Sequence, residues 1–179
     1  MSIRLRRKFV LLGFSASCIV LAATPVPAQS DDSTITAVSG TVTGNVQGVG
    51  FRAMIQKQAI EYNLTGLTEN RSDNSVRFVL QGAKDRVDKA LNAMRRGTKK
   101  SSNVAVQVTP VSVDEGLKTF TIVGWTSDSR SILRPYDLTF DLRPDNSTVD
   151  KKEAKAVWLE ICRKTVKGED VGKCDKDGD

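Results

Sequence analysis

The sequence predicts an α+β fold of the ferredoxin-like type, a split βαβ sandwich whose helices cover one face of a mainly antiparallel sheet. Two observations predict it. Apolar residues alternate with polar ones in several short segments, as in half-buried strands, and they recur at helical spacing in two longer segments. These segments follow the order β-α-β-β-α-β with one further terminal strand, and a strand and a helix are expected in a C-terminal extension.

The first predicted strand and helix are joined by a glycine-rich turn. Three valines and two glycines share one face of the strand between Val38 and Val46, and glycines on that face let another backbone approach closely. The turn occupies residues 47–50. A helix is expected over 51–62, because apolar residues recur there every three to four positions.

A hairpin, a second helix and two more strands are expected next. The turn-forming residues Arg71 to Asn74 separate the hairpin strands, and Gly97 ends the helix. The expected ranges are 65–70, 75–81, 83–96, 104–108 and 120–122.

The predicted domain covers residues 34–125, and residues 126–179 form the expected extension. Alternating apolar residues predict a strand over 136–142, and helical spacing predicts a helix over about 149–166. Ser147 and Asp150 are expected to form a capping box at the start of that helix.

The first 28 residues have the layout of a secretory signal peptide. Basic residues precede the apolar run 10–23, and small residues at 26–28 offer a cleavage site before Gln29. The run is too short to cross a membrane as a helix, and an uncleaved anchor is the alternative. Arg6 and Arg7 resemble a twin-arginine signal, so export to a bacterial periplasm or secretion is expected by that or the general route.

Removal of residues 1–28 changes the charge and the cysteine count. The whole chain has 27 Lys and Arg against 21 Asp and Glu, and four of the basic residues lie in this segment, which leaves 23 against 21. A net charge of +2 gives no basis for nucleic-acid binding. Cys18 is lost with the segment, so Cys162 and Cys174 are the disulfide candidate in an oxidising compartment.

The sequence contains no histidine, which excludes several mechanisms. No Ser-His-Asp or Cys-His nucleophile pair can form, and no imidazole can bind a metal ion. Neither mature cysteine begins a Cys-x5-Arg phosphate loop, and the aspartates of the C-terminal tail lack the spacing of a calcium loop. No metal ion and no cofactor are expected.

The stretch GNVQGVGFR at 44–52 carries most of the functional information. N–H groups of a glycine turn at a helix start converge on one point, and a guanidinium in the first turn can hold two phosphoryl oxygens. We therefore expect an anion site with Arg52 at its centre. The other expected binding residues are Gln47, Gly48, Val49, Gly50 and Phe51.

Two alternatives exist for this stretch. One is a structural turn followed by a surface arginine. The other is the dinucleotide pattern GxGxxA over 48–53, but a hairpin follows instead of a parallel βαβ unit, and Asn70 stands where an acidic residue is needed. The basic pairs at 95–96 and 99–100 are expected on a solvated face, and near a cleft they would attract anionic substrates.

The same stretch resembles the signature of the acylphosphatase family, and GLTEN at 66–70 resembles the family's second motif. Asn70 follows Arg52 by 18 positions, as in the family's catalytic pair. The resemblance covers about residues 34–124. Leu67 and Thr68 replace the usual Trp and Val, and Asn74 replaces a turn glycine; these departures concern packing near the site.

The resemblance implies an acylphosphatase, which hydrolyses carboxylic-phosphoric anhydrides, and no metal ion is expected. Together with the expected signal peptide, it predicts an exported enzyme. Arg52 would bind the phosphoryl group, and Asn70 would orient the attacking water. The implied substrate is a small-molecule acyl phosphate. The charge balance predicts no nucleic-acid partner, and the short apolar run predicts no stable membrane span. The alternative is a non-catalytic anion-binding or adaptor module that uses residues 126–179 to contact a protein partner.

Overall fold

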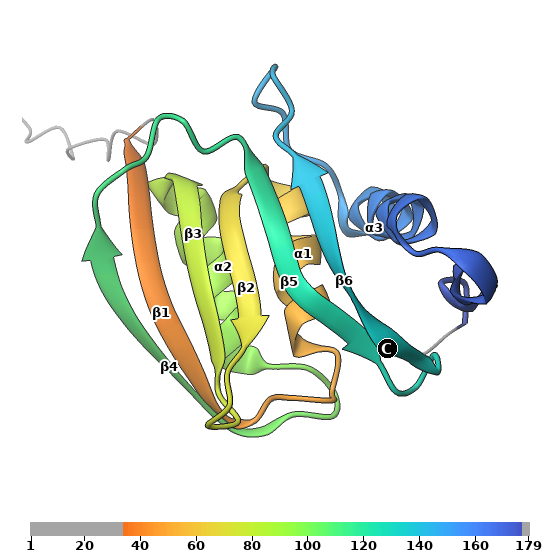
Figure 1. The fold of residues 1–179 in the computed structure, drawn as a ribbon. Coiled ribbons are helices and arrows are strands. Elements are labelled where there is room, and N and C mark those ends of the chain that lie inside the picture. Colours follow the sequence, from red (N-terminus) through yellow and green to blue (C-terminus); the bar gives the residue numbers. More distant parts are fainter. Residues whose placement is uncertain (1–33, 177–179) are drawn as a thin grey trace, which may run out of the picture. The chain divides into compact units, whose positions relative to one another are not determined.

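A computed structural model describes residues 34–176 (Figure 1). The expected signal peptide, residues 1–28, lies outside the described residues. The strands are β1 (Ile35–Asn45), β2 (Thr65–Asn70), β3 (Val76–Ala83), β4 (Ser102–Val111), β5 (Thr119–Ser127) and β6 (Ile132–Asp141). The helices are α1 (Phe51–Tyr62), α2 (Lys84–Arg96), α3 (Lys151–Thr165) and the 3-10 helix η1 (Gly168–Lys173).

The strands form one sheet in the order β4-β1-β3-β2-β5-β6. Neighbouring strands are antiparallel except β2 and β5, which are parallel. The first four strands with α1 and α2 have the ferredoxin-like βαββαβ order, so the fold predicted from the sequence is confirmed. The strand expected in the extension becomes β6 and continues the sheet beyond β5.

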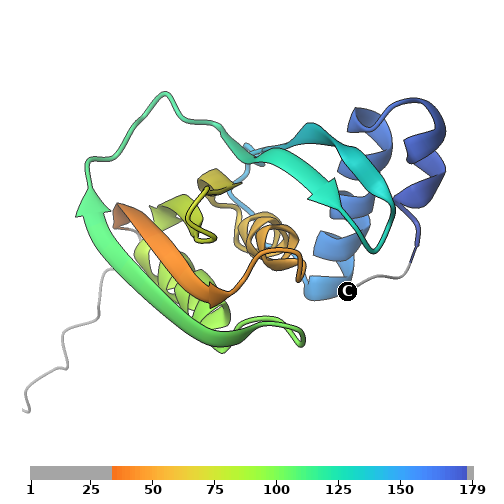
Figure 2. The same cartoon turned by 60° about the horizontal axis from the view of Figure 1, so that its bottom comes forward.

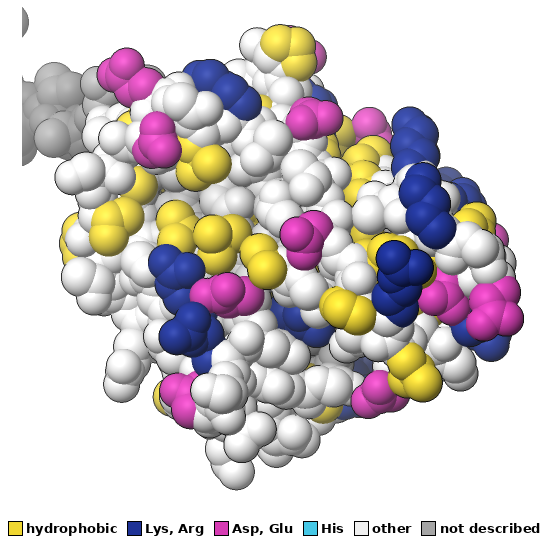
Figure 3. Space-filling view, in the orientation of Figure 1, with side chains coloured by type: hydrophobic (Ala, Val, Ile, Leu, Met, Phe, Trp, Pro, Cys, Tyr) yellow, Lys and Arg dark blue, Asp and Glu magenta, His cyan; other side chains and the backbone are white. Residues whose placement is uncertain are grey.

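The helices lie on one face of the sheet, with α1 between α2 and α3 (Figure 2). The core forms between this layer and the sheet, and its larger fully buried side chains include Ile55 of α1, Phe78 of β3 and Phe120 of β5. The opposite face of the sheet is open. It shows basic and acidic side chains interspersed with small apolar groups, as is common for an antiparallel sheet with one solvated face (Figure 3).

The C-terminal helix packs on the fold through tryptophan. Trp158 of α3 is 1% exposed and meets Trp125 of β5 edge to face, with 5.6 Å between the ring centroids. A disulfide joins Cys162 of α3 to Cys174 after η1, as the sequence predicts, with 5.9 Å between the Cα atoms. Within the described residues, no helix is long and apolar enough to span a membrane.

The capping box expected at the start of α3 is wrong in its position. Asp150 is the N-cap, and its carboxylate accepts a hydrogen bond from the backbone N–H of Glu153 at 2.8 Å. The backbone carbonyl of Ser147 instead accepts from Nε of Arg143 at 3.0 Å, which keeps this segment outside the helix. The helix is therefore capped by Asp150, three residues after Ser147. Glu153 follows Asp150 at the same three-residue spacing that separates Ser147 from Asp150.

Candidate active site

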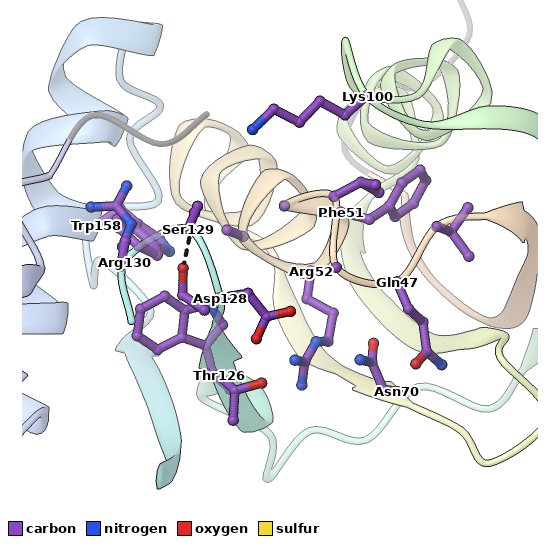
Figure 4. A pocket seen from close by; sticks show the side chains of 17 residues that line it. Gln47, Phe51, Arg52, Asn70, Lys100, Thr126, Asp128, Ser129, Arg130 and Trp158 are labelled. Atoms are coloured by element: carbon purple, nitrogen blue, oxygen red, sulfur yellow. Dashed lines mark hydrogen bonds between the residues drawn. The ribbon is translucent and has the colours of Figure 1, made fainter. Parts of the chain in front are cut away.

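A cleft of about 230 Å³ opens where β1 leads into α1 (Figure 4). One wall consists of residues 46–53 with Asn70, and this wall contains every binding residue predicted from the sequence. The other wall consists of residues 125–130 with Trp158, and Lys100 lies at the rim. The structure thus brings Gln47, Gly48, Val49, Gly50, Phe51, Arg52 and Asn70 to one place.

The turn before α1 needs glycine at two positions. Gly48 and Gly50 have φ values of 69° and 75°, which are left-handed and strained for residues with a Cβ. Space is no constraint at Gly48, because a Cβ there would meet nothing within 4 Å. The two glycines alternate with Val49 and Phe51, an arrangement that turns successive N–H groups toward one side.

The backbone N–H groups of this turn are free to bind an anion. The first N–H groups of a helix have no acceptor within the helix. Among the described residues, no hydrogen bond engages the backbone N–H groups from Gly48 to Ala53. The first turn of α1 also carries no acidic side chain that could occupy them. The helix dipole adds partial positive charge at the same point.

Two side chains hold the turn in place from opposite directions. Nε2 of Gln47 donates to the carbonyl oxygens of Arg71 and Ser75 in the β2–β3 hairpin, at 2.9 and 2.8 Å. Oγ1 of Thr98 donates to the carbonyl of Val49 at 3.0 Å. The amide nitrogen of the Gln47 side chain is therefore engaged by the hairpin rather than by a ligand in the cleft.

Arg52 is fixed by the backbone of β5. Its Nη1 donates to the carbonyl oxygens of Val123 at 3.0 Å and Gly124 at 2.9 Å. The side chain is only 9% exposed, and burial lowers the pKa of the guanidinium from its ordinary value. Its remaining N–H groups can bind a ligand, because one nitrogen carries both of these contacts.

A β-bulge creates this pair of carbonyl acceptors. Val123 and Gly124 together oppose Asp137 of β6, because the register shifts between Ile122 and Trp125. Gly124 has a left-handed φ of 59°, and its N–H donates to Oδ1 of Asp137 at 2.8 Å. The extra residue also moves the buried face of β5 from Ile122 to Trp125, which brings the indole beside the cleft.

Asn70 reaches the same cleft from β2. The parallel register pairs Glu69 with Val123, so Asn70 follows at the level of Gly124, whose carbonyl accepts from Arg52. Both side chains are directed into the cleft (Figure 4). Among the described residues, none forms a hydrogen bond with the Asn70 carboxamide. The two residues predicted as a pair therefore line the same cleft, although they come from different elements.

Comparisons with known proteins match the ferredoxin-like part of this chain. The model of the family described as Acylphosphatase matches residues 38–122. The chain is 37% identical over 82 residues to an acylphosphatase of Chlorobaculum tepidum, which covers 46% of this chain and 89% of that protein. It is 43% identical over 75 residues to an acylphosphatase of Alcanivorax borkumensis, covering 42% and 76%.

The chain belongs to the acylphosphatase family. It is an acylphosphatase, a hydrolase that acts on acyl phosphates. Among solved structures it is similar to the acylphosphatase from Bacillus subtilis, with 32% identity, a TM-score of 0.47 and coverage of 49% of this chain and 98% of that one.

The second wall of the cleft lies outside the family match. Residues 125–130 and Trp158 come after residue 122, where the match ends. Trp158 packs against Trp125 and also lines the cleft. No pattern in the sequence places the β5–β6 turn of this acylphosphatase beside the anion site. Lys100 differs, because it belongs to the basic pair at 99–100, which is expected to attract anionic substrates near a cleft.

Proposed function

We propose that this acylphosphatase hydrolyses acyl phosphates to a carboxylate and inorganic phosphate, with Arg52 binding the phosphoryl group and Asn70 orienting the attacking water. The observation that carries the proposal is the convergence of three features on one cleft. These are the free backbone N–H groups before α1, the guanidinium of Arg52 and the unengaged carboxamide of Asn70.

Phosphoryl transfer spreads negative charge over the oxygens of the transferred group. Donors that are fixed before the reaction stabilise this charge without having to reorganise. Both donor sets meet this condition here: the turn is held by Gln47 and Thr98, and Arg52 is held by the bulge in β5. An acyl phosphate expels a carboxylate, a good leaving group, so no strong general acid is needed.

A carboxamide cannot act as a strong base, so Asn70 is assigned a positional role. Its oxygen and N–H groups can hold a water molecule next to the phosphorus atom of the phosphoryl group whose oxygens Arg52 binds. Positioning of this kind suits a reaction whose transition state is loose and needs little proton transfer.

The test is hydrolysis of benzoyl phosphate by the chain that begins at Gln29. We expect turnover by the wild type, and a loss of at least about 10²-fold in kcat/KM for Arg52→Ala and Asn70→Ala. Arg95→Ala and Asn92→Ala on α2 are matched controls, because these residues do not line the cleft. Circular dichroism verifies that the variants fold. A wild type without turnover, or an active Arg52→Ala protein, contradicts the proposal.

Export is a separate part of the proposal. We infer that residues 1–28 are a signal peptide that directs the protein to a bacterial periplasm or to the medium. The layout of basic and apolar residues supports it, and a disulfide between the two cysteines that remain suits an oxidising compartment. Mass spectrometry of the expressed protein tests it: an N-terminus at Gln29 is expected, and an intact N-terminus on all of the protein contradicts it.

A further inference from the structure

We propose that the wall formed by residues 125–130 is the subsite for the acyl group, and that it favours short acyl groups carrying both an ammonium and a carboxylate group. The proposal rests on the proposed function, because it concerns the substrate of the same reaction. It adds a substrate class, amino-acid acyl phosphates, and two residues that select it, Asp128 and Lys100.

The direction of the acyl group follows from the geometry of displacement. The attacking and leaving oxygens lie roughly in line on opposite sides of the phosphorus atom. Asn70 ends β2, Arg52 is bound to β5, and residues 125–130 continue from β5 toward β6, on the side away from β2. A water molecule held by Asn70 therefore places the acyl group against residues 125–130.

The wall formed by residues 125–130 presents polar groups to the cleft rather than an apolar surface. The side chains of Thr126 and Asp128 face Arg52 across the cleft (Figure 4). Asp128 is exposed at the tip of the β5–β6 turn, and no described residue forms a hydrogen bond or ion pair with its carboxylate. A carboxylate facing a phosphate site repels the phosphate, so its favourable partner is a cationic group on the acyl chain.

A positive charge stands at the opposite rim of the cleft. Lys100 is exposed, and its side chain extends across the mouth from the segment before β4 (Figure 4). No described residue forms a hydrogen bond or ion pair with its ammonium group. The two rim charges have opposite signs and come from different walls. An acyl group that carries an ammonium and a carboxylate can therefore engage both.

The second wall packs against α3 and the C-terminal segment. The guanidinium of Arg130 lies 5.3 Å from the centroid of the Trp158 ring, and Nη1 donates to the carbonyl of Cys174. Trp158 lines the cleft, and among the described residues its buried indole N–H has no hydrogen-bond partner. With a volume of about 230 Å³, the cleft is smaller than pockets for drug-sized ligands, so it suits a phosphate with a short acyl chain.

Four acyl phosphates with the same three-carbon core test the effects of Asp128 and Lys100 separately. Propionyl phosphate has neither group, β-alanyl phosphate has only the ammonium, succinyl phosphate has only an added carboxylate, and β-aspartyl phosphate has both. We expect kcat/KM to be highest for β-aspartyl phosphate. Each matching exposed charge is expected to contribute about threefold relative to propionyl phosphate.

Two charge-removing variants assign the contributions. Asp128→Asn should lower the ratio of kcat/KM for β-alanyl over propionyl phosphate about threefold, and Lys100→Gln should do the same for succinyl over propionyl phosphate. Asp141→Asn on β6 and Lys99→Gln are matched controls, because neither side chain lines this cleft. Both ratios should stay at their wild-type values in these controls. At high salt, where the charges are screened, the wild-type ratios should fall toward those of the two charge-removing variants.

The outcomes separate this inference from the proposed function. Equal kcat/KM for the four substrates would overturn the subsite while leaving the hydrolase intact. An equal change in kcat/KM on all four substrates in Asp128→Asn would mean that its carboxylate acts on the phosphoryl end that they share, which also contradicts the subsite. Hydrolysis of none of the four, with benzoyl phosphate also intact, would instead refute the proposed function.

Discussion

Nη1 of Arg52 donates a hydrogen bond to the carbonyl oxygen of Val123, 3.0 Å away. A side chain from the first turn of α1 is thus held by the backbone of β5, and Gly124 supplies a second acceptor at 2.9 Å. The position of the phosphoryl-binding guanidinium therefore depends on the shape of a strand that follows it by about 70 residues.

Arg52→Lys is expected to lower kcat/KM for benzoyl phosphate by about 10²-fold. Lysine keeps the positive charge, but a single ammonium cannot bind the β5 carbonyls and two phosphoryl oxygens at once. Steady-state kinetics with phosphate as a competitive inhibitor measure the effect, and we expect phosphate binding to weaken as well. Activity close to that of the wild type would show that charge alone suffices.

Asp137→Ala is expected to raise KM for benzoyl phosphate more than it lowers kcat. The carboxylate accepts from Gly124 N–H and so holds the bulge that presents the carbonyls to Arg52. Asp137→Asn should restore KM, because its side-chain oxygen can still accept, and Asp141→Ala on the same strand is the control. An equal fall in kcat for Ala and Asn would contradict this positional role.

The Cys162→Ser/Cys174→Ser variant is expected to lose about 3 kcal/mol of unfolding free energy, because the crosslink closes a loop with a sequence separation of 12. For a protein of this size the midpoint of thermal unfolding should fall by about 10 °C. Calorimetry of the variant beside the oxidised wild type measures it. Wild type treated with a reductant should approach the variant, and equal midpoints before reduction would contradict the prediction.

Acid is expected to weaken the attachment of η1 through Asp170. Hydrogen bonds from Lys173 at 2.6 Å and Tyr136 at 3.1 Å lower the pKa of this carboxyl below its ordinary value of 3.8. Because the pKa is lower in the folded state, the stabilisation is present above about pH 4 and is lost as pH falls through the folded-state pKa.

Thermal unfolding of wild type and Asp170→Asn at several pH values checks this. The wild type should be more stable at pH 6, and the difference should shrink on moving toward pH 3. A difference that stays constant or grows in acid would mean that the carboxylate does not contribute in this way.

The sequence predicts the order of the helices and strands and most of their ends within a few residues, because most of them have one buried face and an apolar period that matches their structure. The largest differences are at β5, which extends five residues beyond the expected 122, and at β6, which begins four residues before the expected 136. The glycine turn at residues 47–50 is also predictable, because two glycines directly before a helix indicate a tight turn from the local sequence alone. The bulge at Val123 and Gly124 is not, because it depends on pairing with Asp137 of β6. The start of α3 is ambiguous for a related reason: Ser147 and Asp150 both suit a cap, and contacts with Arg143 decide between them.

The second wall of the cleft could not be predicted from the motif at all. Residues 125–130 reach the cleft because β5 lies beside β2 and the bulge turns Trp125 inward, and both facts concern strand pairing rather than local sequence. The position of Lys100 is an intermediate case. Its charge is visible in the sequence, but only the fold places it at the rim.

The pairing of β6 with β5 has a consequence for any attempt to shorten this protein. Ending the chain after residue 125 would leave the backbone donors and acceptors of β5 unpaired along one edge and would uncover Trp125, which is now 4% exposed. An unprotected apolar edge strand is a template for intermolecular aggregation. Residues 126–179 therefore shield the backbone edge of β5 and the indole of Trp125 from contact with other molecules.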